Sequence, residues 1–358
     1  MICDDLMIGG WTTIAGVIPE LRKKLNIYVI CLFGGGPFAE ELERQGIKIY
    51  YFNINKYNLP LKIVQLALFF MKHDIDIVHT NLHLSHIIGQ TTALLCRKKR
   101  IMHMHSLEKK TKGLTGLWKS FLVSKTHMVI PVSNASRNAF MEVYPGYKNK
   151  LKVIYNGIDI ESFQKAHRSS GYSRSDFGLP RDSFIFITVA NLKWEKGYEH
   201  LIEAAEKTPE NIHFMIVGNG YLRDPLIKKV NTAGLSARFH FVGQRRDIPD
   251  LLSLADAFIL PSILEGFPIC IIEALSASLP IIATNVGGIP EMLTNMNNSI
   301  VVPPSDTQNL SNAINKLYED SALRKKLSKN ALETVKGFDI RAISEKYRNA
   351  YIELTAKQ

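Results

Sequence analysis

Two glutamates, Glu265 and Glu273, stand eight positions apart in this chain. An apolar stretch at 257–260 precedes the two glutamates and predicts a strand. Between them lies the bend Gly266-Phe267-Pro268, which is followed by an apolar pattern with helical spacing. A helix beginning near Phe267 would place Glu265 at its mouth and Glu273 roughly two turns along it. Free N–H groups and the positive end of the dipole at a helix mouth suit a phosphate. The two carboxylates then predict a grip on the hydroxyl-rich parts of a ligand with a phosphate centre, which is the layout of a nucleotide sugar.

Taken alone, the pair would be explained better by helix capping at Glu265 and solvation of Glu273. The surrounding motifs favour the functional interpretation, because Pro261-Ser262 precedes the pair and Gly287-Gly288-Ile289-Pro290-Glu291 follows it. In order and spacing the segment resembles a family 4 retaining glycosyltransferase, whose GT-B architecture has two Rossmann-like domains. The resemblance spans nearly the whole chain, and its other motifs are Ile8-Gly9-Gly10, His103-Met104-His105, Val132-Ser133-Asn134, Asn156-Gly157-Ile158-Asp159, Lys196-Gly197 and Gly218-Asn219-Gly220.

Apolar runs alternate with helical patterns along the chain, which predicts an α/β protein with parallel sheets. Two sets of six strands are expected, in two doubly wound halves: 27–32, 47–51, 75–79, 100–103, 128–132 and 152–155, then 183–189, 213–217, 239–242, 257–260, 280–283 and 299–301. Only Met1-Ile2-Cys3 precede Asp4, so the strand before the first glycine loop is expected to be a stub.

We expect the chain to form two domains and a C-terminal helix, with a polar connection at 165–175 that follows the first domain. They are residues 1–162, an N-terminal Rossmann-like domain; 163–338, a C-terminal one; and 339–358, an amphipathic helix. The resemblance implies that the first domain binds the acceptor, the second binds the nucleotide sugar across a cleft from it, and the helix crosses back onto the first.

At 358 residues, with 46% hydrophobic and 22% charged residues, the composition is that of a globular protein large enough for two cores. The four cysteines form no close-spaced pair, and the first ten residues carry acids where a signal peptide has a basic region. These features predict a cytoplasmic protein. The apolar stretch 59–71 is too short for a transmembrane helix, which needs ~20 residues, and predicts a buried helix.

Positive charge is concentrated in the first half. Residues 1–165 hold 22 Lys+Arg against 12 Asp+Glu, a net +10, whereas residues 166–358 hold 22 against 21. A cluster at Arg97–Arg100 and a lysine-rich stretch at Lys109–Lys125 account for much of it. Within the second stretch, helical spacing places five apolar residues on one face: Leu114, Leu117, Trp118, Phe121 and Leu122. A peripheral position on an anionic inner membrane face is one interpretation, and a core helix with a solvated basic side is the other. Nucleic acid is not expected, since no recognised binding module accompanies the charge.

Several residues at predicted strand ends suit phosphate chemistry. Gly9 and Gly10 precede a helix at 12–25, where a backbone without side chains can approach a phosphate, although a plain turn has the same sequence. Lys196 can neutralise a leaving diphosphate, unless it is a solvated surface lysine. Gly218 and Gly220 end a strand at the edge where open α/β sheets bind ligands.

The resemblance assigns further roles. It implies that Glu273 holds the ribose hydroxyls, that Glu265 contacts the transferred sugar, and that the Gly266–Phe267 bend and the N–H of Ile269 approach the phosphates. It places His105 near the sugar and His103 in the interior. It also implies a part in donor binding for Asn191, where relatives commonly have arginine, and for Arg245, which follows the predicted strand 239–242. No metal site is expected, because His79, His83 and His86 lack a fixed spacing on one element.

The implied reaction moves a hexose-type sugar, with retention, from a nucleoside diphosphate to a hydroxyl. A UDP-sugar is favoured over a GDP-sugar, and no cofactor is implied. The expected acceptor is a saccharide, and in particular a lipid-linked one used in surface polysaccharide synthesis. Two alternatives stay open from the residues, a nucleotide-sugar 2-epimerase on the same fold and a non-catalytic nucleotide-sugar binder.

Overall fold

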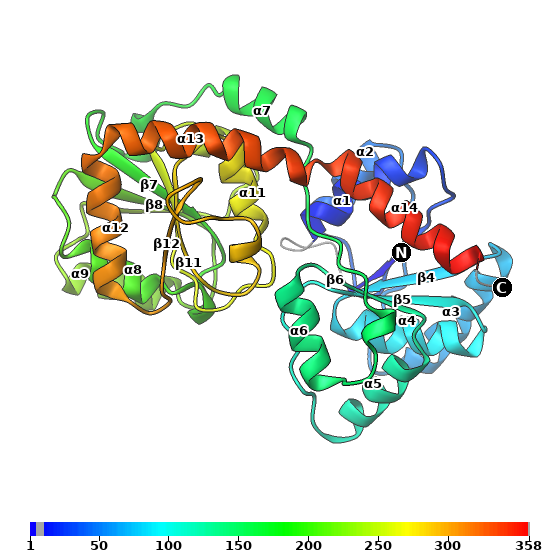
Figure 1. The fold of residues 1–358 in the computed structure, drawn as a ribbon. Coiled ribbons are helices and arrows are strands. Elements are labelled where there is room, and N and C mark those ends of the chain that lie inside the picture. Colours follow the sequence, from blue (N-terminus) through cyan, green and yellow to red (C-terminus); the bar gives the residue numbers. More distant parts are fainter. Residues whose placement is uncertain (5–10, 357–358) are drawn as a thin grey trace. The chain divides into compact units, whose positions relative to one another are not determined.

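The computed structural model describes residues 1–4 and 11–356, in two compact units. One unit comprises Met1–Gly157 together with Ile340–Gln358, and the other comprises Ile158–Asp339. Each unit contains a six-stranded sheet with helices on both sides (Figure 1). The expected α/β fold with two doubly wound parallel sheets is confirmed.

The first sheet has the strand order β3-β2-β1-β4-β5-β6. Its strands are β1 (Ile2–Cys3), β2 (Val29–Cys31), β3 (Ile49–Tyr51), β4 (Ile77–Asn81), β5 (Lys99–Met104) and β6 (Met128–Pro131). All pairs are parallel, and the two-residue β1 pairs on both sides, with Ile2 opposite Ile30 and Thr80. The chain therefore changes direction across the sheet between β1 and β4, which puts the ends of these strands at a topological switch point.

Helices cover both faces of the first sheet. They are α1 (Trp11–Arg22), α2 (Pro37–Arg44), α3 (Leu59–Lys72), α4 (His83–Leu95), α5 (Gly113–Lys125), α6 (Asn134–Val143), the short η1 (Lys148–Lys150) and α14 (Ile340–Ala356). The C-terminal helix α14 packs against α1 in the same core, and its expected apolar side is buried. Helices α3, α4 and α5 follow one another side by side, because α4 contacts both of its neighbours (Figure 1).

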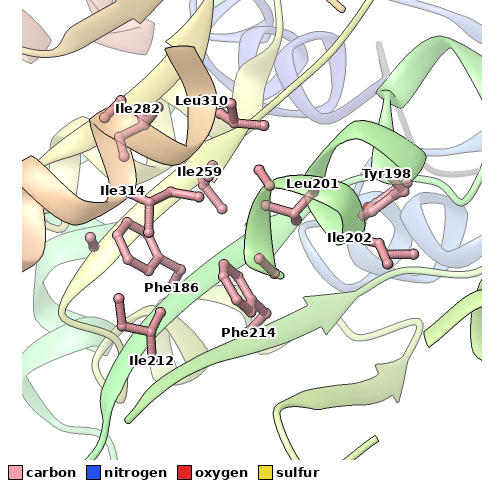
Figure 2. Close-up of a cluster of buried hydrophobic side chains, with 14 of the residues drawn as sticks. Phe186, Tyr198, Leu201, Ile202, Ile212, Phe214, Ile259, Ile282, Leu310 and Ile314 are labelled. Carbon is pink, nitrogen blue, oxygen red and sulfur yellow. The ribbon is translucent and has the colours of Figure 1, made fainter. Parts of the chain in front are cut away.

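The second sheet has the order β12-β11-β10-β7-β8-β9. Its strands are β7 (Phe184–Val189), β8 (Ile212–Val217), β9 (Phe239–Gly243), β10 (Ala257–Leu260), β11 (Ile281–Thr284) and β12 (Ile300–Val302). Its helices are α7 (Ile160–Arg168), η2 (Arg174–Phe177), η3 (Trp194–Lys196), α8 (Tyr198–Ala205), α9 (Arg223–Thr232), α10 (Ile248–Leu252), α11 (Ile269–Ser276), η4 (Ile289–Glu291), α12 (Thr307–Glu319), α13 (Ser321–Val335) and η5 (Lys336–Phe338). Aromatic rings of β7 and β8, Phe186 and Phe214, stack at 5.9 Å in the core beneath α8 and α12 (Figure 2).

Two of the motifs named above act as helix caps. Ser133 accepts a hydrogen bond from the N–H of Ser136 at the start of α6, and Asp159 accepts one from Ser162 at the start of α7. Such caps satisfy N–H groups that have no partner within the helix, and each stabilises a helix by ~1 kcal/mol. Val132-Ser133-Asn134 and Ile158-Asp159 therefore have a local structural function.

Four expectations need correction. Residues 152–155 form no strand, although Lys152 and Ile154 donate to carbonyl groups of β6. The predicted polar connection begins inside α7, whose last residue is Arg168. Helix α11 begins at Ile269, because Pro268 precedes it in extended conformation. The fourth concerns α3, which buries only Leu66 and Phe70 and leaves other apolar side chains exposed.

Two of the expected surface cations lie in the interior. Arg100 donates to the carbonyl groups of Lys98 and Lys125, and Lys119 forms an ion pair with Glu108 whose side chains are both at most 5% exposed. The basic surface is thus smaller than the sequence suggests. No helix of the described residues is long and apolar enough to cross a membrane.

Candidate active site

The switch point of the second sheet lies between the neighbouring strands β7 and β10. From β7 the chain adds β8 and β9 toward one edge of the sheet, and from β10 it adds β11 and β12 toward the other edge. The loops that follow these two strands are bonded to each other, because the N–H groups of Ile263 and Leu264 donate to the carbonyl of Glu195. Glu195 precedes Lys196, and Leu264 precedes Glu265. The sheet topology therefore brings these two predicted site residues together.

Lys196 and Glu265 form an ion pair, with the Lys196 Nζ donating to the Glu265 Oε1 at 2.6 Å. The hydroxyl of Ser262 donates to the same oxygen at 2.7 Å. The Glu265 side chain is 7% exposed and that of Lys196 21%, so the glutamate is almost fully covered and the lysine keeps a small accessible surface. Although burial alone would lower the pKa of Lys196, the Glu265 carboxylate outweighs it and the net shift of that pKa is upward. Lys196 is therefore a fixed positive charge at neutral pH.

Gly287, in the loop after β11, allows the backbone of this site to close. Its φ is +54°, and a Cβ atom on it would lie 1.8 Å from the carbonyl oxygen of Glu265. The neighbouring N–H of Gly288 donates to the carbonyl of Gly266 at 3.1 Å. Glycine at 287 is thus required both by the conformation and by the close approach of the Glu265 backbone.

Substituting Gly287→Ala is expected to displace the loop that bears Glu265. The left-handed conformation costs alanine about 1–2 kcal/mol, and the clash should add about 1–3 kcal/mol. Gly234→Ala is the matched control, because Gly234 has a φ of +71° and open space around its Cβ position. Thermal unfolding and nucleotide affinity measure the result. Equal losses of stability in the two variants would show that the contact with Glu265 is unimportant.

Glu273 lies on α11 and is half-buried. Its carboxylate makes no hydrogen bond or ion pair with the residues that the structure describes. Burial raises its pKa to about 7, so the carboxylate is held in an environment that disfavours its charge. Two hydroxyl groups of a ligand could donate the hydrogen bonds that this carboxylate lacks. A vicinal diol such as that of ribose fits this requirement.

The remaining predicted donor-binding residues lie on neighbouring loops. Asn191 follows β7 and is exposed, Phe267 is 4% exposed in the bend before α11, and Ile269 is half-buried at the first position of α11. Gly218 and Gly220 follow β8, where added Cβ atoms would meet the carbonyl oxygens of Ala190 and Leu192 at 2.0 and 2.3 Å.

Arg245 follows β9 and is held in place by its neighbours. It forms an ion pair with Asp247, its guanidinium donates to the Tyr172 hydroxyl, and it lies 5.4 Å from the centre of the Phe177 ring. A ligand of Arg245 would have to share it with these groups.

Histidines collect at the carboxyl end of β4 and β5 in the first unit. The amide nitrogen of Asn81 donates to the carbonyl of Ile2, so its Oδ1 faces His103 Nδ1 and His105 Nε2, each at 3.0 Å. An amide oxygen can only accept, and both histidine nitrogens must therefore donate. His105 Nδ1 is left as an acceptor, buried and without a hydrogen-bond partner among the described atoms.

This arrangement keeps both rings neutral. Burial lowers the pKa of His105 to about 4 and that of His103 well below its usual range. The Tyr347 hydroxyl, on α14, donates to the remaining nitrogen of His103 at 3.1 Å. His105 is thus a neutral hydrogen-bond acceptor for a hydroxyl group, positioned by a residue of another strand.

The other two histidines of interest have separate partners. His79 hydrogen-bonds the Tyr351 hydroxyl at 2.7 Å, and His86 hydrogen-bonds Thr80 at 2.9 Å, while His83 is exposed. Within residues 1–4 and 11–356, no group of three or more His, Cys, Asp and Glu side chains could hold a metal ion. Gly9 and Gly10 lie outside the described residues.

Sequence reasoning missed two residues of these networks, Ser262 and Asn81. Ser262 belongs to the motif before Glu265, and a hydroxyl three positions before a buried carboxylate is a usable signal. Asn81 is the last residue of β4, next to the switch point, where polar residues often serve ligands.

Comparison with known families accounts for both units. The family described as Glycosyltransferase Family 4 matches residues 8–162, and the family described as Glycosyl transferases group 1 matches residues 172–334. The chain belongs to glycosyltransferase family 4. The resemblance read from the motifs is therefore confirmed, and the matches do not support the alternatives of an epimerase or a non-catalytic binder.

Two relatives of this glycosyltransferase match most or part of its length. It is 28% identical over 356 residues to the UDP-Gal:alpha-D-GlcNAc-diphosphoundecaprenol alpha-1,3-galactosyltransferase of Escherichia coli, covering 94% of this chain and 91% of that protein. It is also 28% identical over 222 residues to the N,N'-diacetylbacillosaminyl-diphospho-undecaprenol alpha-1,3-N-acetylgalactosaminyltransferase of Campylobacter jejuni, covering 61% of this chain and 58% of that protein.

Solved structures share the fold of this glycosyltransferase. The Anabaena protein HepE in complex with UDP-glucose has a TM-score of 0.85 at 23% identity, over 98% of this chain and 99% of that one. A glycosyltransferase from Rickettsia africae has a TM-score of 0.83 at 21% identity, over 100% and 99% of the two chains. These likenesses confirm the GT-B fold.

Proposed function

We propose that this enzyme transfers a hexose-type sugar from a UDP-sugar, with retention, to a hydroxyl of a lipid-linked saccharide in surface polysaccharide synthesis. The observation that carries the proposal is the Lys196–Glu265 ion pair at the switch point of the second sheet, with the unpartnered Glu273 carboxylate on the adjoining helix. The Escherichia coli relative acts on UDP-galactose and a diphosphoundecaprenol-linked acceptor, and HepE binds UDP-glucose, which supports this choice of donor and acceptor.

In this proposal each group has one task. Lys196 meets the charge that develops on the leaving diphosphate, and Glu265 accepts hydrogen bonds from sugar hydroxyls. Glu273 holds the ribose, and His105 Nδ1 accepts a hydrogen bond from a hydroxyl. The leaving phosphate removes the proton of the acceptor hydroxyl on the same face, so the protein contributes positioning and charge rather than a separate base. The diphosphate lies against Lys196 and the backbone N–H groups of the loops that carry Asn191, Gly218, Gly220, Gly266, Phe267 and Ile269, and no metal ion or cofactor takes part.

The acceptor belongs to the first unit, which we place at the inner face of the membrane as a peripheral protein. Exposed cations support this assignment: Arg97, Lys109, Lys110, Lys112 and Lys125. Arg100 and Lys119 are excluded from it because they lie in the interior.

Thermal shift with UDP, GDP, ADP and their sugars tests the donor. UDP and UDP-hexoses are expected to raise the melting temperature, since a ligand at about a hundred times its Kd stabilises the folded state by ~2.7 kcal/mol. Incubation of the preferred UDP-hexose with undecaprenyl-diphosphate-linked saccharides then tests transfer, and the anomeric configuration of the product tests retention. A shift with GDP alone would refute the choice of base, and inversion would refute the mechanism.

A further inference from the structure

Helix α3 exposes an apolar stripe that the fold does not cover. Leu61, Val64, Leu68 and Met71 are each between 55% and 60% exposed, and their spacing of three, four and three residues places them on one side of the helix. Leu66 and Phe70, on the opposite side, fill the core. A large contiguous apolar patch is uncommon on a protein surface and usually marks an interaction site.

A second stripe runs along α5. Leu114 is 85% exposed and Leu117 70%, and Trp118 and Phe121 stack on each other with ring centres 5.1 Å apart. The Trp118 Nε1 donates to the Thr91 hydroxyl of α4 at 3.0 Å, which fixes the indole at the surface. Helix α4 lies between α3 and α5 and adds the exposed Leu84 and Leu95 (Figure 1). The three neighbouring helices all carry exposed apolar side chains, and their exposed sides are here called the α3–α5 face.

The part of the chain that includes α3, α4 and α5 carries most of the net positive charge. Residues 51–130 contain twelve Lys+Arg and three Asp+Glu, a net +9 of the total +11. Of the three acids, Glu108 is buried against Lys119, which leaves Asp74 and Asp76 exposed beyond the end of α3. An apolar surface flanked almost entirely by cations is complementary to an anionic lipid bilayer, because lipid tails and phosphate headgroups match both components.

A groove beside α3 continues the apolar surface. It has a volume of about 780 Å³, and Leu68 and Met71 of the stripe form part of its lining, together with Phe69. Lys62 and Lys72 also line it. An acyl chain on the apolar lining and a phosphate at these lysines would occupy it as an anionic phospholipid does.

We propose that the α3–α5 face docks on an anionic bilayer, with the α3 and α5 stripes entering the headgroup layer and the flanking lysines meeting lipid phosphates. This inference deepens the proposed use of a lipid-linked acceptor, on which it rests for its biological purpose. It extends the membrane contact beyond the basic stretch of α5 to α3, whose apolar side chains supply the component that salt does not screen.

The test is vesicle flotation of the full chain, using phosphatidylcholine with and without phosphatidylglycerol, at low and high salt. The wild type should bind the anionic vesicles and largely spare the neutral ones. The triple variant Leu61→Gln, Leu68→Gln, Met71→Gln should lose about tenfold or more in vesicle affinity, and should do so at both salt concentrations. The triple variant Lys110→Gln, Lys112→Gln, Lys125→Gln should lose mainly the salt-sensitive part.

Controls keep the outcomes separate. Leu332→Gln with Ile352→Gln removes exposed apolar side chains outside the face and should leave vesicle binding unchanged. Stabilisation by UDP, measured on every variant, reports the donor site independently, so failure of the membrane inference and failure of the proposed function are distinguishable. Wild-type binding by the α3 variant, or equal binding to neutral and anionic vesicles, would overturn the proposal, as would self-association through this face without vesicle binding.

Discussion

Replacing Lys196 with methionine is expected to lower kcat by about 10²–10³-fold, because a preorganised charge aimed at the leaving group acts mainly in the transition state. The effect on the Kd of the donor should be smaller. The substitution also leaves the Glu265 carboxylate buried without its partner, and breaking a buried ion pair in this way costs about 3 kcal/mol of stability. Steady-state kinetics, donor titration and thermal unfolding together measure these effects.

The double variant Lys196→Met with Glu265→Gln separates the structural effect from the chemical one. It removes both charges, so stability should recover relative to Lys196→Met, whereas kcat should stay low. Lys229→Met is the matched control, because Lys229 pairs with Glu203 at the same 2.6 Å distance on the surface and should change little. Recovery of kcat in the double variant would refute a catalytic role for Lys196 and leave it as a counter-ion for Glu265.

The second sheet was largely predictable from sequence because its strands are short apolar runs between clear breaks. The expected strand 257–260 is β10 itself, and 183–189 exceeds β7 by one residue. In the first unit, the prediction of a strand at residues 152–155 was wrong. That segment lies extended beside β6 and donates hydrogen bonds to Val129 and Pro131, yet its pairing amounts to a single bridge at Leu151. Local pattern identifies extended backbone, but it does not identify how many hydrogen bonds a neighbour will supply.

Side-chain partners that are distant in sequence were the least predictable feature. Residue type and strand-end position singled out Lys196 and Glu265, but nothing local indicated that a lysine 69 residues away would pair with that glutamate. For the same reason a run of four cations gave no sign that Arg100 turns inward and donates to the carbonyl groups of Lys98 and Lys125. Charge counts in sequence therefore overestimate the basic surface.

Helix α3 illustrates a second limit. Its sequence is apolar on nearly every side, and a helix of that kind is expected in a core. Which sides are covered depends on the number of neighbours that the topology provides. Here the sheet and α4 cover Leu66 and Phe70, and no element of the described chain covers Leu61, Val64 or Leu68. The exposed stripe is a consequence of position in the fold rather than of local pattern.

Substituting Glu273→Gln is expected to weaken the binding of UDP by about 30-fold or more, since each hydrogen bond from a ribose hydroxyl to a charged acceptor contributes ~1.5–3 kcal/mol. The same substitution should raise the melting temperature of the nucleotide-free enzyme above pH 7. The sign follows from the raised pKa, because the charged form is disfavoured in the folded state, so Glu273 lowers stability progressively as the pH rises toward its folded-state pKa of about 7. At acid pH, where the group is protonated in both states, the two proteins should differ little.

Nucleotide binding should reverse this penalty and thereby depend on pH. Ribose hydroxyls bind the ionised form of Glu273, so binding below pH 7 releases a proton. The affinity for the nucleotide should therefore decrease as the pH falls below 7, by at most about tenfold for each pH unit. The phosphate of UDP titrates as well, and uridine, which has the ribose without the phosphate, removes that contribution from the measurement. Calorimetric titration in buffers of different ionisation enthalpy counts the protons released. An unchanged pH dependence of binding in the Glu273→Gln variant would show that Glu273 does not hold the ribose. Loss of the pH dependence in that variant, together with greater stability of the nucleotide-free enzyme, would show that the Glu273 carboxylate binds the donor and destabilises the free enzyme.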